Sequence, residues 1–437
     1  MNAQNSPGTP QNNVIPEGFK IINIGLTPDD WNLLKLDEFI EQIKDSVDPS
    51  TTNIQKYVGL KHMDSGNCQI RRWGNPSDVR STKYAFQPSN VLYGKLRPYL
   101  DKVVYAEFDG ICSTDIIVLK AKNNANNIFI SYLLHHPLVL NHAIATTTGV
   151  NHPRTSWKKL SKLKILLPPL PEQRNIAQVL STIQTAREKT KSVIQATKEL
   201  KKSMMKHLFT YGPIPPSKAG SVPLKETEIG MVPEGGDVVR LGDVIKGTQY
   251  GISMRGNPEG DYPILRMNNL IDGRIETLDL QYVDLDDDAF EKFRVNPGDI
   301  LFNRTNSFEL VGKTSLFNIR DVFVFASYLV RAVPDITKLS PEYINYYLNW
   351  DSTQNRLKFL ATRGVSQSNI NATKLRNFIV SVPSLPTQQK IVSILTSIDE
   401  KLRSEENKKK ALDEMFKTML NNLMTGKIRV NDLEVDT

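Results

Sequence analysis

The chain repeats itself once, and this repeat limits its possible folds more than any other feature of its 437 residues. When the sequence is laid over itself so that Pro168 meets Pro383, seven identities fall within sixteen positions, where composition alone gives roughly one. The matched residues are Pro168, Leu170, Pro171, Gln173, Ile176, Leu180 and Ile183 over Pro383, Leu385, Pro386, Gln388, Ile391, Leu395 and Ile398. A second match near the start of each copy places Ile24 and Gly25 over Ile229 and Gly230. Two copies of one plan are therefore expected, with a net ten extra residues in the middle of the second copy.

Two segments that lack glycine predict long helices. Residues 171–209 and 386–424 are rich in Lys, Glu, Gln, Leu and Met, and proline occurs only at their first positions, where a helix tolerates it. A helix of this length spans about 58 Å at 1.5 Å per residue. Apolar residues of the first segment recur at alternating steps of three and four from Ile176 to Met204, which is typical of a coiled coil. Paired spacer helices are favoured over helices that pack only within their own core.

The segments between the helices are mixed, with short alternating apolar runs broken by Gly, Pro and Asn that predict strands. The expected fold class is α+β, with two mixed domains and two long helices in a pseudo-twofold repeat. The expected boundaries are a first domain at 1–168, a helix at 169–212, a linker at 213–235, a second domain at 236–383, a helix at 384–430 and a tail at 431–437.

Net charge and cysteine content narrow the class of protein. The formal net charge is +8, which favours an anionic partner such as nucleic acid without requiring one. Two cysteines, Cys68 and Cys112, exclude a disulfide scaffold and favour a reducing compartment. The polar first twelve residues do not resemble a signal peptide, and no run of eighteen apolar residues occurs. A cytoplasmic protein with no membrane partner is expected.

The segments that open the two predicted helices resemble one known family. Residues 169–180 and 383–395 each contain a Leu-Pro-x-Gln motif, and residues 229–234 precede the second domain as in that family. The chain resembles the specificity subunits of type I restriction-modification systems over nearly everything after its first twenty residues. One departure is Gly236, where the family usually carries an aromatic residue and the first copy has Trp31.

The resemblance implies a role in directing chemistry that other subunits perform. Each mixed block would be a target-recognition domain that reads one half of a split site in double-stranded DNA, and an antiparallel coiled coil would set the spacing. Two modification subunits would bring S-adenosylmethionine and an adenine methyltransferase site. Restriction subunits would bring ATP and Mg, and this chain would hold no cofactor. A complex that only methylates remains open.

The candidate DNA-binding residues lie on loops at matched places in the two copies. Cations suit phosphates, and forked or amide side chains suit base edges. The alternatives are a solvated loop with an aromatic residue in the core, and a turn that feeds the next strand. The candidates are Tyr93, Lys95, Arg97, Asn151 and Arg154 in the first copy, and Asn303, Arg304, Asn306, Lys313, Arg363, Ser366 and Asn369 in the second.

The helices supply candidates for partner binding or for the spacer itself: Gln173, Ile176, Leu180, Ile183, Gln388, Ile391, Leu395 and Ile398. A rival interpretation is a coiled-coil scaffold whose mixed domains bind protein rather than DNA.

Catalytic motifs are incomplete in this sequence. Ser307 stands where a phosphate-binding loop ending at Lys313 needs its first glycine. An Asn-Pro-Pro-aromatic segment, expected of an adenine methyltransferase, does not occur. His135 and His136 have no Cys or carboxylate at ligand spacing, so neither a metal site nor a catalytic residue is expected.

Overall fold

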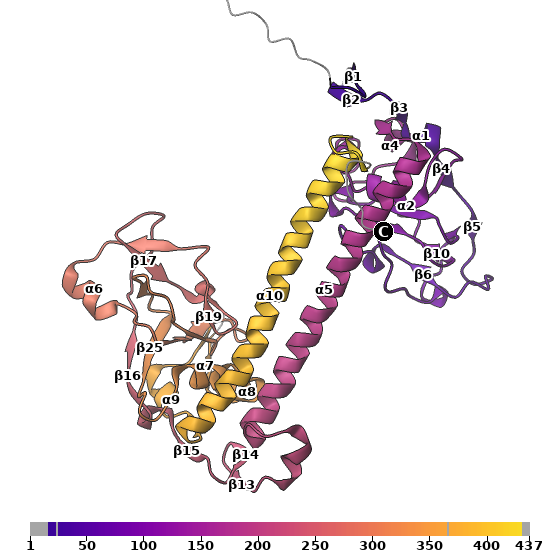
Figure 1. Cartoon of the computed structure of the whole chain (residues 1–437). Helices are drawn as coiled ribbons and strands as arrows, with labels where there is room; N and C mark the ends of the chain where they lie inside the picture. Colours follow the sequence, from indigo (N-terminus) through magenta and orange to yellow (C-terminus); the bar gives the residue numbers. More distant parts are fainter. Residues whose placement is uncertain (1–15, 23–24, 365–366, 431–437) are drawn as a thin grey trace, which may run out of the picture. The chain divides into compact units, whose positions relative to one another are not determined.

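The computed structural model describes residues 16–22, 25–364 and 367–430. Its contacts divide the chain into two units, unit 1 with Met1–Lys191 and Lys408–Thr437, and unit 2 with Ser192–Asn407. Two long helices, α5 (Leu170–Tyr211) and α10 (Leu385–Met424), each have one end in each unit (Figure 1). The fold is α+β with an internal repeat, as the sequence predicts.

Unit 1 contains two four-stranded sheets, two strand pairs and four short α-helices within its described ranges. The sheets, in strand order, are β5 (Ser46–Val47), β7 (Lys83–Phe86), β10 (Gly110–Cys112) and β6 (Tyr57–Val58), then β4 (Ile40–Ile43), β11 (Ile116–Ala121), β8 (Val91–Gly94) and β9 (Val103–Tyr105). The strand pairs are β1 (Phe19–Ile22) with β2 (Gly25–Pro28) and β3 (Asn32–Lys35) with β12 (Lys164–Leu167). The helices are α1 (Leu36–Phe39), α2 (Asn127–Leu133), α3 (Pro137–Ala145) and α4 (Trp157–Leu160).

Unit 2 repeats much of this plan. Its four-stranded sheet is β16 (Ile245–Tyr250), β25 (Leu329–Pro334), β21 (Ile300–Asn303) and β23 (Thr314–Leu316), which corresponds to the sheet that contains β8. Two three-stranded sheets are β20 (Gln281–Val283), β17 (Tyr262–Leu265) and β24 (Val324–Phe325), and β22 (Thr305–Asn306), β27 (Ser368–Asn369) and β26 (Thr362–Arg363).

Strand pairs and short helices complete unit 2. The pairs are β13 (Leu224–Thr227) with β14 (Gly230–Pro233), β15 (Asp237–Arg240) with β28 (Ile379–Val382), and β18 (Leu270–Ile271) with β19 (Arg274–Ile275). The helices are α6 (Asp287–Phe293), α7 (Pro341–Asn349), α8 (Asp351–Leu360) and α9 (Ala372–Arg376).

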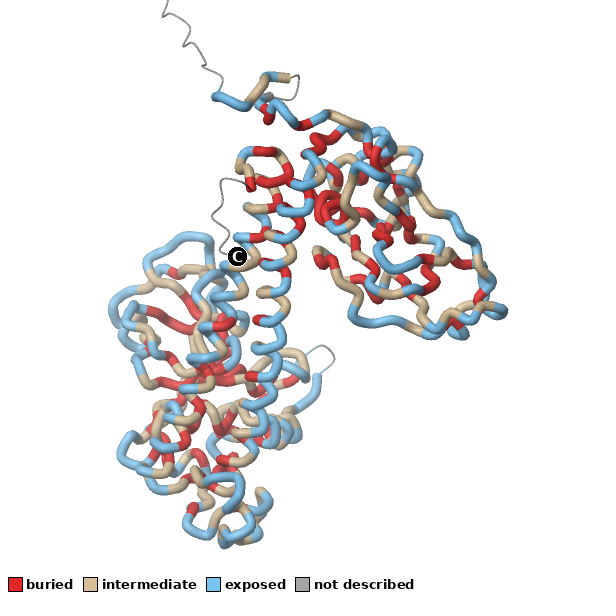
Figure 2. Tube along the Cα trace, turned by 45° about the vertical axis from the view of Figure 1, so that its right-hand side comes forward, coloured by how far each residue is buried: buried red, intermediate tan, exposed pale blue. Residues whose placement is uncertain are grey.

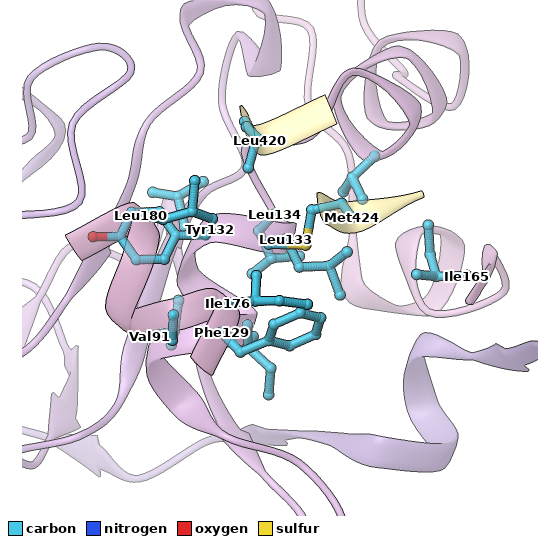
Figure 3. Close-up of a cluster of buried hydrophobic side chains, with 14 of the residues drawn as sticks. Val91, Phe129, Tyr132, Leu133, Leu134, Ile165, Ile176, Leu180, Leu420 and Met424 are labelled. Carbon is cyan, nitrogen blue, oxygen red and sulfur yellow. The ribbon is translucent and has the colours of Figure 1, made fainter. Parts of the chain in front are cut away.

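The main core of each unit joins the start of one long helix to the end of the other. In unit 1, Ile176 and Leu180 of α5 pack with Leu420 and Met424 of α10 against α2 and β8 (Figure 3). In unit 2, Ile391 of α10 packs with Leu208 of α5 in the corresponding core. Complete burial of one such side chain contributes about 1.5–3 kcal/mol. Figure 2 shows buried stretches gathered inside each unit.

Between these apolar cores, ion pairs join the two long helices in antiparallel order. In unit 2, Lys198 Nζ lies 3.3 Å from Glu406 Oε1, and Lys201 Nζ lies 2.6 Å from Asp399 Oδ1. Residue numbers rise along one helix as they fall along the other, so the two chain directions are opposite. In unit 1, Arg187 Nε lies 2.7 Å from Asp413 Oδ1. The apolar residues predicted for the middle of this contact, Val193 and Leu200, are instead 40% and 51% exposed.

The second long helix ends at Met424, as the glycine-free segment 386–424 predicts, and so before the boundary expected at residue 430. Gly426 follows with φ of +69°, a left-handed conformation that stops a helix and that glycine adopts without strain. Residues 427–430 then continue in unit 1 as an irregular segment.

Candidate nucleic-acid interface

In unit 1, backbone contacts join the two loops that carry the predicted DNA-binding residues. Leu96 forms an isolated β-bridge with Arg154, and Arg154 forms another with Thr148. The Arg97 N–H donates to the Pro153 carbonyl at 2.8 Å. The Lys95 carbonyl accepts from the Thr155 N–H at 3.0 Å. The chain stretches around residues 95–97 and 148–154 therefore form one surface.

Unit 2 builds the same arrangement as a regular three-stranded sheet of β22, β27 and β26. Thr305 pairs with Asn369, and Asn369 pairs in turn with Thr362. The Arg304 carbonyl accepts from the Ile370 N–H at 2.9 Å, as the Lys95 carbonyl does from Thr155. We call each set of paired segments a loop ladder: residues 95–97 with 148–155 in unit 1, and β22, β27 and β26 in unit 2.

The loop ladder defines which residues of the two copies are equivalent. Arg304 takes the position of Lys95, because each accepts from the corresponding N–H and donates across to the neighbouring strand, to Tyr328 at 3.0 Å and Asp115 at 2.9 Å. By the same pattern Asn306 corresponds to Arg97, and Asn369 corresponds to Arg154. The backbones match while the side chains differ.

The cations of the first loop ladder differ in how freely they can reach a ligand. Arg97 is exposed, and among the described residues no hydrogen bond or ion pair engages its guanidinium. Arg154 is committed to Asp115, with Nε 2.8 Å from Oδ1 and Nη2 3.3 Å from Oδ2. Lys95 is half-buried and Asn151 is exposed. Arg97 is thus the cation of this loop ladder best placed for an external acceptor.

In the second loop ladder the arginines stack on aromatic rings. The Arg304 guanidinium lies 4.8 Å from the Tyr250 ring centre, and its Nη1 donates to the Ser327 carbonyl at 3.0 Å. The exposed Arg363 lies 4.0 Å from the ring centre of Phe308. A ring beneath a guanidinium favours one placement of that group. The Nε of Arg304 is buried, so of the two arginines Arg363 is the more accessible.

Amide side chains make up the rest of the second loop ladder. The Asn369 Nδ2 donates to Thr305 Oγ1 at 2.7 Å, and the Asn306 Oδ1 accepts from the Ser307 N–H at 2.8 Å. Lys313, which comes after β22 in the sequence, is half-buried. A hollow of about 380 Å³ opens on this part of unit 2, lined by Ser307, Phe308, Glu309, Arg363, Gly364, Gln367 and Ser368.

Two predicted DNA contacts lie inside the protein, so their prediction is corrected. Tyr93 is 3% exposed because β8 continues through it, and burial raises the pKa of its hydroxyl. Asn303 is 1% exposed at the end of β21, and among the described residues its amide has no hydrogen-bond partner. Ser366, another candidate, lies outside the described residues.

The glutamines of the two Leu-Pro-x-Gln motifs have a role that the sequence did not reveal. Gln173 accepts from the Asn126 N–H at 2.9 Å and donates to the Asn124 and Pro168 carbonyls. Gln388 accepts from the Ser340 N–H at 2.7 Å and donates to the Lys338 and Pro383 carbonyls. Both side chains are fully buried, so each fastens the start of a long helix to its own domain.

The apolar helix candidates are likewise engaged within the units rather than presented to a partner. Buried in the two main cores are Ile176, Leu180, Ile183, Ile391 and Leu395, while Ile398 is half-buried. Their burial assigns them to the cores of the two units, and both predicted roles, spacer and partner binding, stay predictions.

A polar cluster around the buried Glu172 connects the segment that follows α10 with the beginning of unit 1. Glu172 accepts from Arg429 Nε at 2.7 Å and Nη2 at 2.8 Å, and from the Trp31 indole N–H at 2.9 Å. Arg429 Nη2 also lies 2.9 Å from Asp30. In the second copy Gly236 replaces Trp31, so this cluster belongs to unit 1 alone. Comparison of the two copies singled out Trp31, but it did not predict the contacts of Trp31 with other residues.

Metal-ligand clusters and single membrane-spanning helices are not found in the described ranges. No group of three or more His, Cys, Asp or Glu side chains there could hold a metal ion. No single helix there is long and apolar enough to span a membrane, and the bent pair α2 and α3 passes by length and composition only.

Comparisons with known proteins find matches along most of the chain. The sequence model of the type I restriction modification DNA specificity domain matches residues 28–197 and again residues 233–414. A putative type I restriction enzyme MjaX specificity subunit from Methanocaldococcus jannaschii is 32% identical over 204 residues, which are 46% of this chain and 48% of that relative. The MjaVIII specificity subunit of the same organism is 26% identical over 442 residues, covering 95% of this chain and 97% of the relative.

A solved structure supports the fold. The type I restriction-modification S subunit from M. genitalium superposes with a TM-score of 0.59 at 15% identity, over 90% of this chain and 96% of that one. Because the family model matches twice and covers most of the sequence, the chain belongs to the family of type I restriction-modification DNA specificity subunits.

Proposed function

We propose that the two loop ladders are the DNA-reading surfaces of this specificity subunit, each facing one half of a bipartite site. The observation that carries the proposal is the combination of one backbone pattern with two sets of side chains. Base edges are distinguished by hydrogen bonds from side chains such as Arg and Asn, whereas a shared backbone only positions them. Two different half-sites would then be read by one kind of scaffold.

The proposed division of the chain follows the predicted boundaries. Residues 1–168 and 236–383 would be the target-recognition domains, joined by the helical segments 169–212 and 384–430 and by the linker at 213–235. Adenine methylation would be carried out by two modification subunits that bind S-adenosylmethionine. Cleavage would belong to restriction subunits that use ATP and Mg. The subunit would work in the cytoplasm, where its DNA target lies.

The test is to co-express the chain with a modification subunit and to map methylated adenines by single-molecule sequencing. One split motif, with two defined halves around a fixed unspecified gap, is the expected result. A stable complex that methylates nothing and selects no duplex from a random pool would overturn the proposal and favour a protein-binding scaffold.

The long helices provide a second test, since each has one end in each unit. Deleting one heptad from both helices, residues 192–198 and 402–408, removes about 10 Å of helix at 1.5 Å per residue. That length equals roughly three base pairs of B-DNA at 3.4 Å each. The expected result is a shorter gap with both half-site sequences unchanged, and altered half-site bases would contradict the assignment of the domains.

A further inference from the structure

The first loop ladder ends in a turn, residues 97–101, whose backbone needs support. Arg97 and Asp101 have φ of +51° and +47°, a left-handed conformation that side chains other than glycine rarely adopt. Between them, residues Pro98–Leu100 form one turn of 3-10 helix, closed by hydrogen bonds from the Leu100 and Asp101 N–H groups. Local geometry does not favour such a turn, so contacts from the rest of the unit must hold it.

His135, between α2 and α3, supplies a charged contact to the last residue of the turn. Its Nδ1 lies 2.7 Å from Asp101 Oδ1 and its Nε2 lies 3.0 Å from the Val103 carbonyl oxygen. Both partners are acceptors, so both ring nitrogens donate and the ring carries a positive charge. Burial alone lowers the pKa of His135, but Cys68 and the hydrogen bond to Asp101 raise it to about 10. An ion pair between the buried His135 and the half-buried Asp101 therefore anchors the end of the turn.

The second copy shows that this charge is not required by the domain itself. Asn349 of α7 bonds the backbone of Thr314, donating to its carbonyl at 2.9 Å and accepting from its N–H at 3.3 Å. Thr314 corresponds to Val103. In each copy, the carbonyl of the residue just before it accepts from the N–H of the last residue of a central strand, β8 in unit 1 and β21 in unit 2. A neutral amide thus fills the equivalent position, and the charged pair is specific to the copy that carries Arg97.

Arg97 is placed by this turn where it can read a base. Its backbone is fixed to Pro153 at one side, and Asp101 is fixed to His135 at the other. The exposed guanidinium has no partner among the described residues. A fixed arginine fork matches the O6 and N7 acceptors of guanine in the major groove.

We propose that His135 is a positioning residue for DNA recognition: it holds the 97–101 turn so that Arg97 reads a guanine in one half of the site. The inference rests on the proposed function and adds a named base, a named reader and the side chain that orients it. Arg97 makes the contact, and His135 acts only through the turn.

The experiment measures methylation by the complex with its modification subunit on duplexes in which each base pair of the mapped site is varied in turn. The variants are Arg97→Ala, His135→Asn, Asp101→Asn and the pair Arg97→Ala with His135→Asn. We expect each single variant to lose roughly tenfold or more of the preference for guanine at one shared position. The double variant should lose no more than Arg97→Ala alone, because both changes remove the same contact.

Matched controls separate positioning from general damage. His142→Asn alters another histidine of unit 1, whose ring bonds the Lys159 carbonyl and forms no hydrogen bond with residues 97–101, so its base preferences should equal those of the unaltered chain. The second half-site should keep its sequence in every variant. Asp101→Asn is nearly isosteric and preserves the test where His135→Asn yields no folded protein.

Three results would overturn the inference. His135→Asn and Asp101→Asn could weaken all positions equally, which marks a merely structural role. The position at which they lose base preference could differ from the position that Arg97→Ala affects. The loss of guanine preference in the double variant could also equal the sum of the losses in the two single variants. An unaltered complex that recognises no site would instead overturn the proposed function itself, and the inference with it.

Discussion

Removal of the Arg429 guanidinium should expose how much the buried cluster with Glu172 stabilises unit 1. Glu172 is 6% exposed and receives two hydrogen bonds from Arg429 and one from Trp31. Arg429→Ala leaves the carboxylate buried with the indole as its remaining partner. Breaking a buried ion pair costs about 3–5 kcal/mol. The Arg429 side chain is 19% exposed, so water offsets part of the loss and about 3 kcal/mol is expected.

Differential scanning calorimetry measures this loss as a shift of the transition of unit 1. For a unit of this size, each kcal/mol lowers Tm by about 2–4 °C, which predicts a fall of roughly 6–12 °C. Hydrogen exchange should show faster exchange in residues 425–430 and around Trp31, because the cluster joins these segments.

Two further variants test the physical cause. Arg429→Ala combined with Glu172→Gln should be more stable than Arg429→Ala alone, since no buried charge is left without a partner. Arg174→Ala, which removes an exposed arginine on the same helix as Glu172, should change stability by less than about 0.5 kcal/mol. The reasoning is refuted where Arg429→Ala matches Arg174→Ala, or where the double variant is the least stable of the set.

Other contacts in the structure carry four more predictions. Gln388→Leu leaves one N–H and two carbonyls without their hydrogen-bond partner and should lower the free energy of unfolding by about 2–4 kcal/mol, as measured in urea. Unaltered stability would contradict this prediction. Gly426→Ala forces a Cβ against the Pro28 ring in a left-handed backbone conformation, and should cost about 1–3 kcal/mol by the same assay. Burial raises the pKa of Cys112 to about 12, so iodoacetamide near neutral pH should label this thiol only after unfolding, as followed by mass spectrometry. The pKa of His135 is raised from 6.5 to about 10, so its stabilisation is complete below pH 6.5 and is lost as pH rises through 10. The stability difference between the unaltered chain and His135→Asn, measured by urea unfolding at a series of pH values, should therefore shrink over that range.

The long helices were predictable because their signals are local. Proline at the second helical position and glycine after the last turn mark their ends, and no helix breaker interrupts them. The register of their contact was less predictable. Of the predicted three-and-four spacing, every seventh residue (Ile183, Thr190 and Thr197) is buried, whereas Val193 and Leu200 at the intervening positions are exposed.

The candidate interface was predictable by region but not by side chain. The matched loops were visible because Gly149 and Val150 align with Gly364 and Val365, while the polar residues that follow differ between the copies. Whether Tyr93 points inward depends on where β8 ends, which the run of apolar residues does not define. The contact of His135 with Asp101 joins residues 34 positions apart on different elements, and no sequence period reports such a pair.

The loop ladder also bears on how such a protein can acquire new targets during evolution. Its pairing consists of backbone N–H and carbonyl groups, which every residue except proline supplies in the same way. A mutation that exchanges Asn306 or Asn369 for another polar residue alters what is displayed without removing a rung of the pairing. Recognition can therefore diverge between the copies, and between lineages, under weak constraint from folding. Positions such as Gln173 and Gln388, whose side chains are themselves structural, have no such freedom.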